Sequence, residues 1–461
     1  MSKRSFYIQT LGCAKNVADT DGINAVLERA GMQSAAHPAD ADVLIVNTCG
    51  FLQSARTESL DTLRELGAGK QNGQLLIAAG CLISRYGEVV QREVPAVDGV
   101  IDAGKWLAMP RFIEWLEQST HTNGDWFDES YLNLPPDQIG ARSVTDHLPR
   151  LASGPSAFLK IADGCDRPCT FCIIPAIKGM HRSKPMDAVI AEARELVSRG
   201  ALEIVLVAQD TTAYGWDWGK RDQLAPLIER LCTEVEGLRW LRLMYAYPGH
   251  VTPRLIEVMA RYPQILHYLD IPLQHAHPQT LHRMKRPNSI VTHKLLDDLH
   301  TAMPDIAIRT TFIVGFPGET DEEFEGLLAF IEEQQFDRVG IFEFSREEGT
   351  PAGAMSDQIE QKVKAQRRAA AMELQQGISL AKNKTLVGRT LDVLVEGVGE
   401  MEIETRRPRR QPAEAVSIGR TYRDAPEVDG MVIIRSQLHL GQLAQIKITQ
   451  GSEYDLIGVP A

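Results

Sequence analysis

Cysteine spacing is the feature of this chain that most clearly predicts chemistry. Six of the seven cysteines fall into two sets of three, which differ in how widely their members are spread. The compact triplet lies within GCDRPCTFC and consists of Cys165, Cys169 and Cys172. The dispersed triplet spans the N-terminal region and consists of Cys13, Cys49 and Cys81. A four-iron cluster has four corners, so three thiolates leave one iron free to bind a small molecule, and two such sites predict a catalyst.

Other roles for these thiols match the spacing less well. A zinc site usually needs four ligands, commonly in CxxC pairs, and the compact triplet has no matching second pair. A partial zinc site or simple buried thiols is the alternative there, and ordinary buried cysteines at strand ends are the alternative for the dispersed triplet. The seventh cysteine, Cys232, lies on a helical pattern among leucines and is interpreted as an inert core thiol.

The dispersed triplet requires elements that bring distant residues together. Three apolar runs, SFYIQTLGC, DVLIVNTCG and QLLIAAGCL, each end in a Gly–Cys or Cys–Gly pair, and the cysteines are separated by 36 and 32 residues. Each interval is about one βαβ unit, which predicts a parallel sheet whose strands all point the same way. The three cysteines then lie past the carboxyl ends of the strands, where open α/β sheets bind ligands.

The rest of the chain predicts two further domains. Six strand-like runs from AFLKIA to VGIFEFS alternate with helical segments, which predicts an open parallel β/α barrel with the compact triplet on its active-site side. After a long surface helix near residues 356–384, short strands separated by turns predict a small antiparallel β-barrel. The predicted fold class is therefore α/β, with domains at 4–120, 145–378 and 380–450 and a linker near 121–150.

Composition limits the class of protein. The chain has 461 residues, 44% of them hydrophobic, and a net charge of -12, which argues weakly against nucleic-acid binding through overall charge. The N-terminus lacks a signal peptide, and no apolar run is long enough to span a bilayer. We expect a cytoplasmic protein without membrane contact, in which clustered cysteines are metal ligands rather than disulfides.

The segment KIADGCDRPCTFCIIPAIKGMHRSKP resembles the radical S-adenosylmethionine motif as it occurs in the methylthiotransferase family. The resemblance implies that the compact triplet holds a [4Fe-4S] cluster whose free iron chelates S-adenosyl-L-methionine, the source of a 5′-deoxyadenosyl radical. TLGCAKNVADTDG, VLIVNTCGF and AAGCL resemble the N-terminal domain of the same family. By that resemblance the dispersed triplet holds an auxiliary [4Fe-4S] cluster, which carries the sulfur or methylthio group to be transferred.

Further motifs within the predicted open barrel also match the family. VAQDTTAYG contains Gln209, DIPLQHAHP contains Gln274, and WLRLMYAY contains Arg242. By analogy we expect these three residues to line the S-adenosylmethionine pocket, although a structural role is about as well supported for any one of them. No catalytic residue beyond the cluster ligands is assigned.

The family includes enzymes that methylthiolate tRNA adenosines and enzymes that modify an aspartate of ribosomal protein uS12. Leu11-Gly12-Cys13-Ala14-Lys15-Asn16 resembles the LGCxKN form of the uS12 branch, whereas the tRNA branch usually carries YGCQMN. TYRDAPEVDG, which includes Asp424 to Gly430, also resembles the uS12 branch. The last domain resembles the TRAM module, yet residues 382–455 contain 11 basic and 11 acidic residues, where an RNA-binding barrel would be basic.

The resemblance therefore favours a methylthiotransferase that acts on uS12, free or in the small subunit, with a tRNA adenosine methylthiotransferase as the alternative. The implied reaction also needs an electron donor and a sulfur donor, whose identities are open. Nucleic-acid contact is secondary: RRPRR, which contains Arg406, Arg407, Arg409 and Arg410, could grip phosphates or form a solvated loop. A non-catalytic iron–sulfur or zinc RNA-binding protein is the rival from another class.

Overall fold

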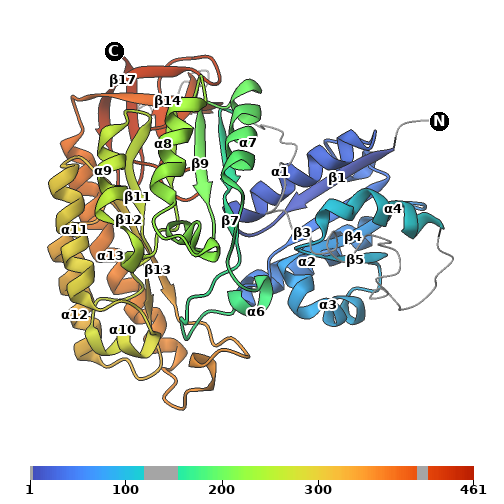
Figure 1. The fold of residues 1–461 in the computed structure, drawn as a ribbon, viewed down its shortest axis with the longest axis horizontal. Coiled ribbons are helices and arrows are strands. Elements are labelled where there is room, and N and C mark those ends of the chain that lie inside the picture. The colour runs from blue at the N-terminus through green and yellow to red at the C-terminus, as the bar shows by residue number, and fades with distance from the viewer. Residues whose placement is uncertain (1–3, 119–153, 402–413) are drawn as a thin grey trace, which may run out of the picture.

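The computed structural model describes residues 4–118, 154–401 and 414–461, which form three domains in contact (Figure 1). The N-terminal domain comprises residues 4–118, the central domain residues 154–385 and the C-terminal barrel residues 390–460. The predicted linker and the RRPRR segment lie outside the described residues. Within the described ranges, no helix combines the length and apolar composition that crossing a membrane would require.

The N-terminal domain is a five-stranded parallel sheet in the order β2-β1-β3-β4-β5, which confirms the predicted parallel sheet. Its strands are β1 (Ser5–Thr10), β2 (Gln33–Ser34), β3 (Val43–Thr48), β4 (Leu75–Gly80) and β5 (Gly99–Asp102). Its helices are α1 (Ala14–Arg29), α2 (Gln53–Gly69), α3 (Cys81–Glu93) and α4 (Met109–Gln118). Separate apolar clusters cover the two faces of the sheet, which explains why residues 43–46 of β3 form a continuous apolar run.

The central domain is a six-stranded parallel sheet whose order follows the chain, so the sheet is open, with β6 and β13 at its edges. The strands are β6 (Ser156–Lys160), β9 (Glu203–Val207), β10 (Trp240–Leu243), β11 (Ile265–Asp270), β12 (Ala307–Val314) and β13 (Arg338–Glu343). A short hairpin pairs β7 (Ala162–Asp163) with β8 (Arg182–Ser183). The helices are α6 (Ile174–Lys178), α7 (Met186–Ser198), α8 (Leu224–Glu234), α9 (Pro253–Arg261), α10 (Pro278–Met284), α11 (Ser289–Ala302), α12 (Asp321–Gln334) and α13 (Gln361–Thr385).

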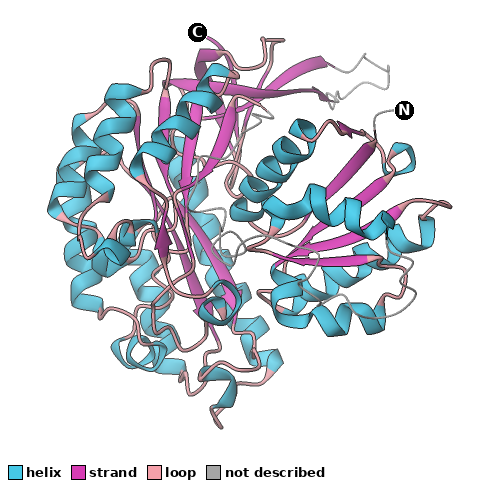
Figure 2. Cartoon of the chain, turned by 45° about the vertical axis from the view of Figure 1, so that its right-hand side comes forward, coloured by secondary structure: helices cyan, strands magenta, loops and turns pink. Residues whose placement is uncertain are grey.

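The two faces of the central sheet have different partners. Helices of the central domain cover the outer face and form the largest apolar core (Figure 2). The inner face packs instead against other domains, because Phe158 and Val205 lie in one cluster with Ala14 and Ala18 of α1 and with Ala425 of the C-terminal barrel. The inner face is therefore closed by the two flanking domains.

The C-terminal barrel is closed by five strands in the order β14-β15-β16-β18-β17. Its strands are β14 (Thr390–Met401), β15 (Glu414–Arg420), β16 (Val432–Ile434), β17 (Leu443–Gly451) and β18 (Leu456–Pro460). All pairs are antiparallel except β16–β18. The predicted end at residue 450 is too early, because β18 pairs with both β16 and β17 and closes the barrel.

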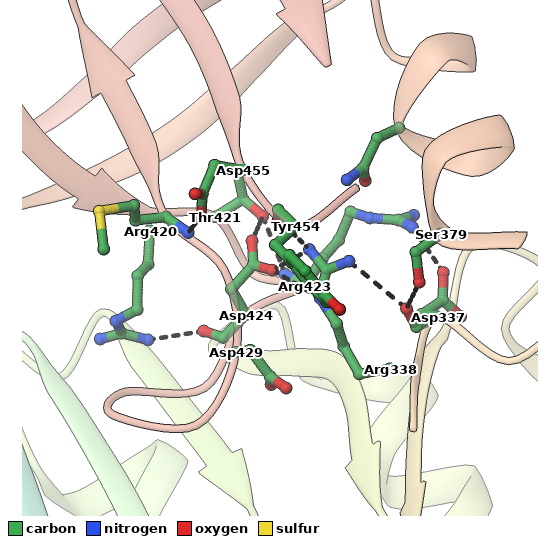
Figure 3. A network of polar contacts seen from close by, with 12 residues as sticks. Asp337, Arg338, Ser379, Arg420, Thr421, Arg423, Asp424, Asp429, Tyr454 and Asp455 are labelled. Carbon is green, nitrogen blue, oxygen red and sulfur yellow. Dashed lines mark hydrogen bonds and ion pairs between the residues drawn. The ribbon is translucent and has the colours of Figure 1, made fainter. Parts of the chain in front are cut away.

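Buried charges hold the C-terminal barrel against the amino-terminal ends of the central strands. Glu203 on β9 receives hydrogen bonds from Arg242 at 2.6 Å and from Arg420 of the C-terminal barrel. Arg338 on β13 pairs with Asp424 at 2.6 Å (Figure 3). Breaking one partner of such a buried pair is costly because the other charge stays buried and uncompensated.

The loop between β15 and β16 supplies further contacts of this kind. Asp429 accepts hydrogen bonds from Tyr268 at 2.7 Å and from Arg309 at 3.2 Å. Arg423 pairs with Asp337 (Figure 3). The TYRDAPEVDG stretch therefore docks the C-terminal barrel onto the central domain.

We expect Glu203→Gln to lower the free energy of unfolding by about 3–5 kcal/mol, because it leaves the buried Arg242 guanidinium without a counter-charge and removes one of the two carboxylates that Arg420 contacts. Denaturant unfolding followed by tryptophan fluorescence measures the effect. The matched control is Glu257→Gln, which removes an exposed pair with Arg261 on α9 and should change stability by less than about 1 kcal/mol.

Glu203 should also make the stability of the fold depend on pH. Burial alone would raise the pKa of Glu203, but Arg242 and Arg420 outweigh it and lower the pKa from 4.5 to about 2. The contribution of Glu203 to stability is therefore complete above about pH 4.5 and is lost as the pH falls toward 2. Glu203→Gln should lose less stability over this interval than the parent chain, and an equal loss would contradict the assignment.

Candidate active site between the two cysteine triplets

The dispersed triplet converges at the carboxyl edge of the N-terminal sheet, as the strand pattern predicts. Cys13 follows β1, Cys49 follows β3, and Cys81 follows β4 as the first residue of α3; these three strands are neighbours in the sheet. Gly12 has φ +93°, and a Cβ at this position would lie 2.7 Å from Cys49 Cβ and 3.0 Å from its Sγ. Glycine at residue 12 thus lets the first two cysteine loops approach closely.

Asn16, in the first turn of α1, braces the three loops. Its side-chain amide donates hydrogen bonds to the carbonyl of Leu11 at 2.7 Å and to that of Thr48 at 3.1 Å. The amide oxygen of Asn16 lies 4.0 Å from Cys81 Sγ. The side-chain amide of Asn47 donates a hydrogen bond to the backbone carbonyl of Asn16 at 3.0 Å. A single buried amide therefore holds the ends of β1 and β3 in place beside the first residue of α3.

The compact triplet follows β7 in the central domain, and each sulfur has a hydrogen-bond donor. The backbone N–H of Arg167 lies 3.4 Å from Cys165 Sγ, and that of Ile174 lies 3.5 Å from Cys172 Sγ. The guanidinium of Arg286 lies 3.7 Å from Cys169 Sγ. Hydrogen bonds to sulfur are one means by which proteins tune iron–sulfur clusters.

Burial of the thiols opposes their ionisation. Burial, followed by the neighbouring thiols, raises the pKa of Cys81 and of Cys172 to about 12, and burial raises that of Cys165 to about 11. Thiols this resistant to ionisation need a cationic partner to act as thiolate ligands.

The arrangement of the donors fits a cluster better than a single ion. In the part of the chain that the structure describes, no three His, Cys, Asp or Glu side chains gather as one metal ion would require. In a four-iron cluster each thiolate binds a different iron, so the sulfurs lie farther apart than ligands of one zinc ion. The described side chains therefore do not form a site for a single metal ion at either triplet.

One segment after β10, residues 245–247, lies between the two triplets. On one side, Lys15 of the N-terminal domain places its Nζ 3.3 Å from the centroid of the Tyr245 ring. On the other, Arg286, the donor to Cys169, lies 4.3 Å from the centroid of the Tyr247 ring. The two cysteine sites thus approach each other across a short stretch of chain.

A cluster of buried charges joins the two domains beside this segment. Lys178 lies 3.8 Å from Asp19 of α1 and 3.6 Å from Asp163, and Lys160 contacts the same two carboxylates. Burial would raise the pKa of Asp163, but Lys160 and then Lys178 outweigh it and hold that pKa well below its usual range. A cavity of about 290 Å³ adjoins this cluster; its lining includes Asp102, Gly104, Asp163, Lys178, Gly179 and Arg182.

Two of the three predicted pocket residues lie at the carboxyl edge of the central sheet, on the side of the compact triplet. Gln209, just after β9, donates to Asp163 at 2.9 Å, and its buried Oε1 has no hydrogen-bond partner among the described residues. Gln274, after β11, has φ +74°, and its backbone bonds Thr311 and Ile313 at 2.8 Å. Their predicted contact with S-adenosylmethionine stays a prediction.

Arg242 is not brought to this edge, and we do not retain it as a pocket residue. Its side chain is fully buried near the C-terminal barrel, where it bonds Glu203 at 2.6 Å and the carbonyl of Tyr422 at 2.7 Å. It also lies 4.5 Å from the centroid of the Tyr268 ring. The sequence pattern placed Arg242 on a strand. Only the position of the C-terminal barrel shows that the Arg242 guanidinium binds Glu203 and the carbonyl of Tyr422 instead of facing the pocket.

Sequence analysis missed three cations at the site, namely Arg167, Lys178 and Arg286. Arg167 lies within the compact triplet itself and bonds His250 at 3.0 Å, and its guanidinium lies 5.0 Å from the centroid of the Trp216 ring. A basic residue between two closely spaced cysteines was a usable signal for Arg167. The other two had no such signal, because their partners are distant in sequence.

Comparison with known proteins agrees with this architecture. Residues 5–102 match the model of uncharacterized protein family UPF0004, residues 159–331 the radical SAM superfamily, and residues 387–460 the TRAM domain. A solved structure of the radical S-adenosylmethionine methyltransferase TsrM from Kitasatospora setae has a TM-score of 0.58 at 12% identity, over 87% of this chain and 81% of that one. At this identity the likeness concerns the fold alone.

Sequence relatives are much closer. Proteins named ribosomal protein uS12 methylthiotransferase RimO are 46% identical in Roseiflexus sp. (strain RS-1), over 98% of this chain and 96% of that one, and 45% identical in Herpetosiphon aurantiacus, over 98% and 99%. The protein of that name from Trichlorobacter lovleyi is 42% identical over 99% of this chain and 98% of its own. Because identity above 40% extends over nearly the full length of both chains, this chain belongs to the uS12 methylthiotransferase RimO family.

Proposed function

We propose that this chain is a radical S-adenosylmethionine methylthiotransferase that converts an aspartate of ribosomal protein uS12 to 3-methylthioaspartate. The observation that carries the proposal is the approach of two cysteine triplets from different domains to the two sides of residues 245–247. Sequence identity of 46% and 45% to relatives of that name, over 98% of this chain, supports the choice of uS12. A ribosomal substrate also implies a cytoplasmic reaction.

The two triplets would hold two [4Fe-4S] clusters with different tasks. The compact triplet would hold the cluster that binds S-adenosylmethionine, and the dispersed triplet would hold the auxiliary cluster. When bound, these groups supply a radical able to take hydrogen from unactivated carbon and the sulfur that replaces it, chemistry that no side chain offers. S-adenosylmethionine would serve both as methyl donor and as radical source, with electrons and sulfur from separate donors.

The residues of the chain position and shield these groups. Arg286 and the backbone N–H groups of Arg167 and Ile174 donate to the sulfurs of the compact triplet. Gln209 offers a buried, unpartnered amide oxygen at the same edge, and leaving such an oxygen without a donor is costly. We infer that Gln209 accepts a hydrogen bond from S-adenosylmethionine and that Gln274 lines the same pocket.

The C-terminal barrel would steady the substrate as a secondary surface. Its loop between β15 and β16 binds the central domain through ion pairs of Asp424 and Asp429. The match to the TRAM domain keeps nucleic-acid contact as an accessory role. The motif LGCAKN and the relatives named for uS12 favour the protein substrate over tRNA.

We expect anaerobically reconstituted enzyme to add one methylthio group to uS12 and none to bulk tRNA. Mass spectrometry of both substrates after incubation with S-adenosylmethionine, a reductant and sulfide measures the transfer. Iron analysis should give about eight irons per chain, because two four-iron clusters are proposed. A methylthio gain on tRNA alone would overturn the substrate, and bound zinc without iron would overturn the reaction class.

Separate cysteine variants should divide the two tasks. Cys169→Ala is expected to abolish cleavage of S-adenosylmethionine yet retain about four irons in the dispersed triplet. Cys81→Ala should instead retain cleavage and lose transfer to uS12. Liquid chromatography of 5′-deoxyadenosine and mass spectrometry of uS12 measure the two steps.

The matched control for both variants is Cys232→Ala. Cys232 lies in the outer-face core on α8, so this variant should keep all the iron and both activities. If Cys169→Ala still cleaves S-adenosylmethionine, the compact triplet does not hold the reducing cluster.

A further inference from the structure

We propose that Lys15 is the specificity residue for the substrate side chain, and that its ammonium group binds the carboxylate of the uS12 aspartate. The inference rests on the proposed function and names a residue that recognises the side chain of the substrate. Three features of Lys15 support it. Lys15 lies at the boundary between two domains, it has no carboxylate partner, and it is only two residues from Cys13 in the chain.

The position of Lys15 is set by two domains. It is the second residue of α1, and the flanking residues Ala14 and Ala18 pack against the inner face of the central sheet. This packing directs Lys15 across the domain boundary, where its Nζ lies 3.3 Å from the centroid of the Tyr245 ring. A cation over an aromatic face is attracted by the ring quadrupole, so the side chain is held rather than free in solvent.

Lys15 differs from the neighbouring lysines in its partners. Across residues 4–118, 154–401 and 414–461, no carboxylate oxygen forms an ion pair with Lys15 within 4.0 Å. Lys160 and Lys178 each contact Asp19 and Asp163.

The nearby Asp270 is already engaged. It accepts a hydrogen bond from the backbone N–H of Tyr245 at 3.1 Å and pairs with Arg309 at 2.8 Å. Lys15 is thus a cation in a mostly buried place whose charge an incoming anion would compensate.

The chemistry of the substrate suits a buried cation that lacks a carboxylate partner. The proposed reaction takes place at the β-carbon of an aspartate, and that carbon is bonded directly to the side-chain carboxylate. A carboxylate held by Lys15, two residues from Cys13, would keep the β-carbon beside the dispersed triplet. Fixing a reacting atom by one bonded neighbour is an efficient form of positioning.

The test is a double-mutant cycle between enzyme and substrate. The enzymes are the parent holoenzyme and Lys15→Met, and the substrates are uS12 and uS12 with asparagine in place of the modified aspartate. Anaerobic binding of fluorescently labelled uS12 to the S-adenosylmethionine-loaded enzyme gives four dissociation constants. We expect the parent to prefer aspartate by about tenfold or more, a preference that Lys15→Met should abolish.

Controls separate a specificity role from a structural one. Iron content and the visible spectrum of Lys15→Met should equal those of the parent, and Lys15→Arg should keep most of the preference. Lys294→Met, the same substitution at an exposed lysine of α11 paired with Asp298, should leave all four constants unchanged.

Each result decides the question. Equal binding of the two substrates by the parent enzyme overturns the proposal, whatever the state of Lys15→Met. A preference that persists in Lys15→Met with full iron content also overturns it. Absence of any methylthio transfer to uS12 by the parent enzyme would instead refute the proposed function, which keeps the two failures distinct.

Discussion

A charge buried in protein must meet a counter-charge, and in this chain many of the counter-charges lie in another domain. Glu203 of the central domain is satisfied by Arg420 of the C-terminal barrel, and Lys160 and Lys178 of the central domain are satisfied in part by Asp19 of the N-terminal domain. Because an unpaired buried charge costs several kcal/mol, other arrangements of the domains are disfavoured. The relative position of the two cysteine sites depends on this constraint.

The same constraint explains why the C-terminal barrel is docked where it is. Its loop between β15 and β16 carries acidic residues that pair with Arg309 and Arg338 near the amino-terminal ends of the central strands. The carboxyl ends of those strands carry the compact triplet and remain available for chemistry. The division follows from strand polarity, since parallel strands present all their carboxyl ends on one side.

The contrast between the buried lysines connects architecture to function. Two of them complete ion pairs across the boundary between the first two domains, whereas Lys15 lies over an aromatic ring beside the first cysteine of the dispersed triplet. A boundary at which Lys160 and Lys178 are neutralised while Lys15 keeps its charge for an incoming anion can admit an acidic side chain and discriminate against a neutral one. Rigid placement of that cation by packing and by the Tyr245 ring favours orientation of the substrate.

Local sequence determined much of this protein. The cysteine spacing, the polarity of the strands and the placement of both triplets at carboxyl edges could all be predicted, because they depend on periodicity and on residues near one another in the chain. Cys232 was correctly separated from the other six by its helical, leucine-rich surroundings. Tertiary structure alone decided the role of Arg242, the docking role of Asp424 and Asp429, and the meeting of Lys15 with Tyr245. The physical reason is that the free energy of a buried charge depends on partners far away along the chain, and no local pattern records which side chains will be brought together.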